Sequence, residues 1–83
     1  MGHTPHELHD EFPDDAGLLH DLKVSDSHFK FVADRYHEVN RAIHRIEVEV
    51  EHASDSRLED LKKQRLSMLD EVSQILTKAK LAV

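Results

Sequence analysis

The chain contains no cysteine and no tryptophan, and only two glycines and two prolines among its 83 residues. Without cysteine there is no disulfide framework, no thiolate metal site and no cysteine nucleophile. No apolar run of the sequence approaches the roughly 20 residues of a membrane-spanning helix. The N-terminus also lacks the basic and then apolar pattern of a signal peptide. We therefore expect a soluble cytoplasmic protein that has no membrane partner.

Basic residues are too few for generic nucleic-acid binding, because the net charge is −6 at pH 7. The acidic excess lies in residues 1–26, which carry seven acidic residues against Lys23 alone. Residues 27–53 have five acidic and four basic residues, and residues 54–83 have five and six. A chain this short builds only a small core. We therefore expect it to gain stability from long helices, from self-association or from a partner.

Apolar residues follow a heptad pattern from residue 29 onward, which predicts amphipathic helices and excludes alternating strands. The first run is Phe29, Val32, Tyr36, Val39, Ile43, Ile46, Val50 and Ala53. After a short polar interruption the spacing resumes at Leu58, Leu61, Arg65, Met68, Val72, Ile75 and Ala79. Neither glycine nor proline occurs after Gly17, so nothing breaks either helix.

The pattern predicts an all-α fold whose main part, residues 27–83, is an antiparallel, coiled-coil-like helical hairpin. Its helices are expected at about residues 27–53 and 56–80, and the short connection between them makes them antiparallel neighbours. Residues 1–26 are expected to form an acidic N-terminal arm with two short helices. We also expect the hairpin to form a bundle by self-association.

Capping residues support these boundaries. Ser25 or Ser27 is the expected N-cap of the first long helix, and Ser56 with Glu59 has the spacing of a capping box for the second. In the arm, Thr4 is the expected cap of the first short helix.

The second long helix carries more apolar surface than a hairpin needs, because Leu66, Leu69 and Leu76 lie beside its heptad seam. Two alternatives remain for what covers this apolar surface: a second copy of the chain, which would complete a four-helix bundle, or the N-terminal arm. The arm offers Leu8, Phe12, Leu18, Leu19 and Leu22. Within the seam, Arg65 is expected to reach solvent or to pair with an acidic residue.

Several segments resemble the YdcH-like family of small bacterial helical-hairpin proteins, a domain of unknown function. They are the early EFP, LHDLKVSDSHF, YHEVNRAIHRIE before the turn, and LKKQRLSMLDEVSQIL after it. They span roughly residues 11–76, and LKKQRLSMLDE is the most specific of them. The resemblance implies a hairpin fold and self-association. It implies no enzyme activity and no family active site.

The stretch HTPHELHDEF at residues 3–12 is the candidate metal site, with His3, His6, His9 and Asp10 as potential ligands. It fails the HExxH hydrolase motif, because Asp10 stands where the second histidine is required. Histidines three residues apart lie about 60° apart around a helix, so neighbours can share an ion more easily than all three. Zinc, nickel or copper(II) would suit these ligands. Ordinary exposure on a polar helix face is the alternative.

A polar strip on the first long helix is the candidate partner or oligomer surface. His37 and His44 lie on one face with Asn40 and Arg41 between them, and Phe31 is a potential exposed anchor nearby. The apolar stripe of the second helix, Leu66, Leu69 and Leu76, completes this candidate surface.

The eight histidines of the chain also raise a pH-responsive oligomer as an alternative, which requires buried histidines. No catalytic set and no phosphate-binding loop is recognisable, so no cofactor is expected. We predict a non-enzymatic helical-hairpin protein that binds another protein or itself. Metal binding by the N-terminal histidines is the first alternative.

Overall fold

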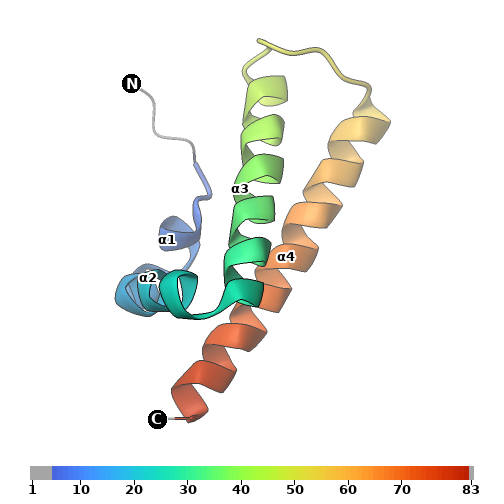
Figure 1. Ribbon diagram of the computed structural model, residues 1–83. Coiled ribbons are helices and arrows are strands. Elements are labelled where there is room, and N and C mark those ends of the chain that lie inside the picture. The colour runs from blue at the N-terminus through green and yellow to red at the C-terminus, as the bar shows by residue number, and fades with distance from the viewer. Residues whose placement is uncertain (1–4, 83) are drawn as a thin grey trace.

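A computed structural model describes residues 5–82, in which two long helices form an antiparallel hairpin and no strand occurs (Figure 1). Helix α3 spans Ser27–Glu47, and helix α4 spans Asp55–Leu81. The two helices pack against each other, which confirms the predicted all-α hairpin. Within the described residues, no helix combines the length and the apolar character needed to cross a membrane.

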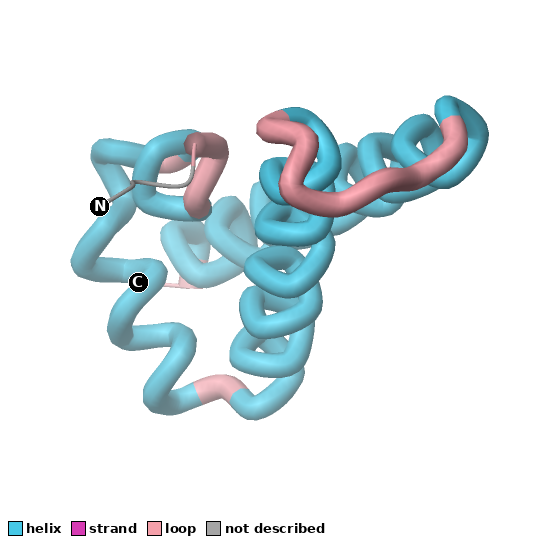
Figure 2. The backbone as a smooth tube through the Cα atoms, turned by 90° about the horizontal axis from the view of Figure 1, so that it is seen from above, coloured by secondary structure: helices cyan, strands magenta, loops and turns pink. Residues whose placement is uncertain are grey.

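The N-terminal arm folds back on one side of the hairpin and lies against α3 (Figures 1 and 2). It consists of α1 (Leu8–Glu11), a 3₁₀ turn η1 (Pro13–Asp15) and α2 (Ala16–Ser25). The expected cap Thr4 lies outside the described residues. Helix α1 starts later than expected, after Glu7, whose backbone N–H donates to the Asp10 carboxylate at 3.2 Å.

The core follows the heptad seam over most of its length. Its buried side chains are Phe29, Val32, Ala33, Tyr36, Val39 and Ile43 of α3 and Leu61, Val72 and Leu76 of α4. Leu8 and Leu19 of the arm join the half of this core that lies near the start of α3. The core is therefore built by three segments, and the arm is one of them.

Helix α3 ends at Glu47, six residues before the predicted end at residue 53, so the seam residues Val50 and Ala53 are exposed. Its end is a Schellman motif, in which the N–H of Glu49 donates to the carbonyl of Ile46 and the N–H of Val50 to that of Arg45, both at 3.1 Å. Glu49 takes the left-handed conformation, with φ 64°. The acidic residues that follow Arg45 oppose the helix dipole, which favours this early end.

Glycine at position 49 is expected to stabilise the protein. A side chain in the left-handed region costs roughly 1 kcal/mol, and glycine removes that cost. The Glu49→Gly variant should therefore raise the free energy of unfolding by about 1 kcal/mol in urea denaturation followed by circular dichroism. Glu51→Gly is the matched control and should not stabilise, because Glu51 is not among the residues with positive φ. An equal gain in the free energy of unfolding for both variants would contradict the left-handed conformation of Glu49 in the Schellman motif.

The N-caps of both long helices differ from the predicted residues. The Asp26 carboxylate caps α3, accepting from the backbone N–H groups of His28 and Phe29 at 3.0 and 3.1 Å. The Ser25 hydroxyl instead donates to the carbonyl of Asp21. At α4 the cap is Ser54, whose Oγ accepts from the backbone N–H of Arg57 at 3.1 Å. The predictions of Ser25, Ser27 and Ser56 as caps were wrong, since each lies one or two residues from the good capping residue that caps the helix.

The two serines before α4 provide a matched test. Ser54→Ala should lower the free energy of unfolding by about 1 kcal/mol, because a backbone N–H loses its acceptor. Ser56→Ala should change it by less than about 0.5 kcal/mol, as for other exposed sites without such a role. Urea denaturation of both variants measures the difference. A larger loss of stability from Ser56→Ala than from Ser54→Ala would mean that Ser56, and not Ser54, caps α4.

Candidate functional site

The N-terminal histidines do not come together as a set of metal ligands in the described part of the chain. His6 Nδ1 lies 2.8 Å from Oε1 of Glu11, and His9 Nε2 lies 3.5 Å from Oδ1 of Asp10. His3 falls outside the described residues. Among residues 5–82, no group of three or more histidine or carboxylate side chains is placed to hold a metal ion.

Asn40, predicted on a polar strip, is instead buried at the contact between the arm and the hairpin. Only 1% of it is exposed. Its Nδ2 donates to the carbonyl of Pro5 at 2.8 Å, and its Oδ1 accepts from Nη1 of Arg65 at 3.0 Å. The prediction for this seam position was that Arg65 would reach solvent or pair with an acidic residue. In the structure Arg65 is half-buried, and the acceptor of its Nη1 is the Asn40 amide oxygen.

Two neighbours of Asn40 also hold the arm. The Tyr36 hydroxyl donates to the carbonyl of His6. His37 Nδ1 lies 2.6 Å from Oε2 of Glu7, although the two atoms are not aligned as a hydrogen bond. We call Tyr36, His37, Asn40 and Arg65 the polar latch, because together they bind residues 5–7 of the arm. The backbone of His6 has φ 63°, and the captured carbonyls hold it in this left-handed conformation.

Burial in the latch raises the pKa of Tyr36 to about 12, and the negative charge of Glu11 adds to the shift. Tyr36 is the only tyrosine and the chain has no tryptophan, so ultraviolet absorbance reports its ionisation alone. We expect a midpoint near pH 12 in the folded protein and near pH 10 in urea.

The sign of the linkage follows from these two values. Because the pKa is raised in the folded protein, the unfolded chain loses the phenol proton at lower pH. The contribution of Tyr36 to the free energy of unfolding is therefore complete below about pH 10 and declines up to about pH 12. Circular dichroism at each pH checks that helices persist. Ionisation near pH 10 with full helical signal would contradict a buried hydroxyl.

Part of the surplus apolar stripe of α4 belongs to the core to which the arm contributes. Leu76 is buried to 2% exposure within the same core cluster as Leu8 and Leu19, and Leu69 packs against this cluster. Leu66 remains 62% exposed. Leu69 and Leu76 are thus covered within the core that the hairpin and the arm build together. Self-association through this stripe stays a prediction, with Leu66 as its exposed part.

The predicted partner surface is not one contiguous strip. Leu76 and Asn40 belong to the interior, and His37 and His44 are half-buried. Phe31 is 64% exposed, but it lies six positions before His37 and hence about 120° away around the helix. Arg41 is exposed beyond the latch. The structure places these residues in the interior and on different sides of the hairpin, and their role in binding a partner stays a prediction.

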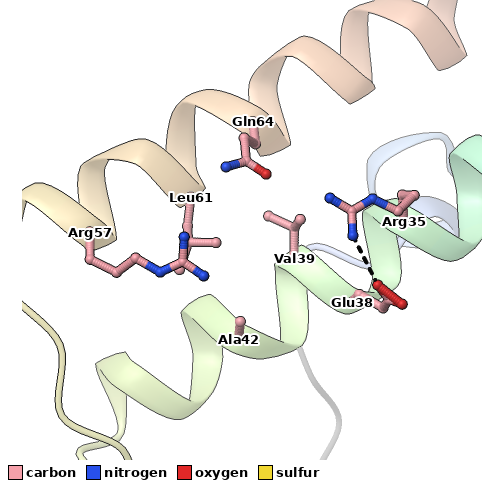
Figure 3. Close-up of a pocket in the computed structure, with 7 residues that line it drawn as sticks. All are labelled: Arg35, Glu38, Val39, Ala42, Arg57, Leu61 and Gln64. Atoms are coloured by element: carbon pink, nitrogen blue, oxygen red, sulfur yellow. Dashed lines mark hydrogen bonds and ion pairs between the residues drawn. The ribbon is translucent and has the colours of Figure 1, made fainter.

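The opposite side of the hairpin carries a groove between α3 and α4 that sequence reasoning missed (Figure 3). It has a volume of about 280 Å³. Val39, Ala42 and Leu61 form its apolar part, and the polar side chains around them are Arg35, Glu38, Arg57 and Gln64. We call this side, including Phe31 one turn before Arg35, the open face, because the arm lies on the other side. Residues of α3 and α4 meet here through the hairpin register, which single-helix periodicity does not reveal.

Comparison with known proteins places the chain in a family. Neither a curated protein nor a solved structure matches it significantly. The family described as Protein of unknown function (DUF465) matches residues 29–76, which cover most of both long helices and all seven groove residues but not the arm. This agrees with the resemblance to YdcH-like proteins. Since the match covers more than half of the sequence, the chain belongs to the DUF465 family of proteins of unknown function.

Proposed function

We propose that the protein is a non-enzymatic helical-hairpin module of the cytoplasm that acts by binding another protein or a second copy through its open face. The observation that carries the proposal is the exposed Phe31 beside a groove with an apolar floor, on the side that the arm leaves uncovered. Phe31 is exposed to 64%, so a partner that covers it would remove a large apolar surface from water, which is favourable. Aromatic and arginine side chains also dominate binding energy at protein interfaces.

The two sides of the hairpin differ in a way that supports this proposal: the arm covers one and leaves the other open. On one side, Leu8 and Leu19 fill the core and the polar latch binds the arm, so that side is already occupied within the monomer. On the other side, the groove presents Arg35 and Arg57 to solvent. An interaction surface of apolar floor and charged rim has the anatomy of a protein interface.

Site-specific photo-crosslinking in cells that naturally make the protein tests this function. A photoreactive phenylalanine analogue replaces Phe31 in one variant and Lys63 in the control. Lys63 is exposed and lies about 200° around α4 from the buried Leu61, so it faces away from the groove. We expect discrete crosslinked products, to a partner or to a second copy, from position 31 only. Equal labelling from both positions, or none from position 31, would contradict an interaction role for the open face.

A further inference from the structure

Two guanidinium groups from different helices point into the groove of the open face (Figure 3). Arg35 approaches from α3, and its Nη1 donates to Oε1 of Glu38 at 3.1 Å. Arg57 approaches from the first turn of α4. Unlike Arg35, Arg57 makes no side-chain hydrogen bond or ion pair with any residue between 5 and 82. The groove therefore contains one arginine whose charge is already matched and one whose charge is not.

Between the two arginines, the groove has a small apolar part within a lining that is otherwise polar. The side chains of Val39 and Leu61 are buried beneath it, and Ala42 keeps it open because its side chain is small. The amide of Gln64 lies on the α4 side, where the structure gives it no hydrogen-bond partner among the described residues. A ligand for this surface needs a compact apolar group for the floor and an acceptor group for Arg57.

We infer that the groove receives an amphipathic helix of a partner protein, whose carboxylate binds Arg57 while small apolar side chains pack on Ala42 and Leu61. This inference rests on the proposed interaction function and names the class of partner. A guanidinium binds a carboxylate with two parallel hydrogen bonds, which gives both strength and orientation. A helix laid along the groove would add a further helix to the hairpin, as in helix-in-groove recognition.

The surrounding charges favour an isolated carboxylate over a polyanion. Four acidic residues lie close in sequence to Arg57: Glu47 at the end of α3, Glu49 and Glu51 in the connection, and Asp55 at the start of α4. The whole chain has a net charge of −6. A nucleic acid brings many phosphates at short spacing and would be repelled by these groups. A helix with a single carboxylate beside an apolar stripe can place that one negative charge at Arg57 and no further negative charge near these acidic groups.

Peptide selection on the full-length protein tests this inference. The probe is a phage-displayed library of helical peptides of about 18 residues, about five turns, with a fixed alanine and leucine stripe and randomised flanking positions. Selection is run separately against the wild type, Arg57→Gln and Arg57→Glu. Arg41→Gln is the matched control, because Arg41 is an exposed arginine of α3 away from the groove. Arg57 has no side-chain partner within the described residues, so circular dichroism should show that its variants fold normally.

The expected result is enrichment of aspartate or glutamate at one flanking position with the wild type. The selected peptides should bind Arg57→Gln at least roughly tenfold more weakly in isothermal titration, and Arg41→Gln unchanged. Selection against Arg57→Glu should instead enrich lysine or arginine at that position. Helices without an acidic preference, equal affinity for Arg57→Gln, or no selected helix at all would overturn the inference. The crosslinking at Phe31 judges the interaction function separately, since it requires no acidic partner.

Discussion

Replacing Phe29 by alanine is expected to lower the free energy of unfolding by about 3–5 kcal/mol, the largest effect of any single change considered. Phe29 is 1% exposed and lies in the core cluster where Leu8 and Leu19 of the arm meet Leu76 of α4. Its loss removes a large apolar side chain and leaves a cavity in contact with three segments of the chain. Since small domains have only several kcal/mol of stability, the variant should be close to unfolding.

The control for this change lies two residues away on the same helix. Phe31→Ala removes the same side chain from an exposed position and should alter the free energy of unfolding by no more than about 0.5 kcal/mol. Urea denaturation of both variants, followed by far-ultraviolet circular dichroism, measures the two values. Comparable losses would mean that Phe31 is also buried, and would remove the basis of the proposed open face.

Removing the Asn40 amide is the second change with a large expected effect. In Asn40→Ala the guanidinium of Arg65 loses its acceptor and the carbonyl of Pro5 loses its donor, both at a half-buried contact. Leaving buried polar groups unsatisfied costs about 1–3 kcal/mol, more for a charged group, so we expect a loss of about 3 kcal/mol. Hydrogen exchange should also become faster in α1, because the latch no longer binds residues 5–7.

Gln64→Ala is the matched control for Asn40→Ala. It deletes an amide from the exposed groove on the opposite side of the hairpin, where the side chain has no hydrogen-bond partner among the described residues. Stability and hydrogen exchange of α1 should both stay at their wild-type values. If Asn40→Ala were equally mild, the contact of the arm with the hairpin would not depend on the latch.

The fold was largely predictable from the sequence, because heptad periodicity is a local signal that repeats many times. The seam residues Val32, Tyr36, Val39 and Ile43 are buried as their spacing predicts. The end of α3 was not predictable from the same signal. Glycine is the usual residue in a Schellman motif, and here Glu49 takes its place, so the sequence carries no mark of the helix end.

The candidate site was predicted only in part, for a different physical reason. Asn40 and His37 were selected as part of a polar partner surface on α3, but in the structure their contacts are with the arm. Two of the latch bonds go to the backbone carbonyls of Pro5 and His6, and any residue offers a carbonyl. Such contacts depend on how a segment some 30 residues away in sequence docks, which periodicity within one helix does not encode. The position of Arg57 in one groove with residues of α3 was missed for the same reason.

The central claim is that the arm packs on its own hairpin and leaves the opposite face open. Nuclear Overhauser contacts between the Leu8 methyl groups and the Phe29 ring test it most directly, since both side chains line the same cavity between the arm and α3. They should be strong in a uniformly labelled sample and absent from an isotope-filtered spectrum of mixed labelled and unlabelled chains, which detects only contacts between molecules. Contacts that appear in the filtered spectrum, or in neither, would contradict the account.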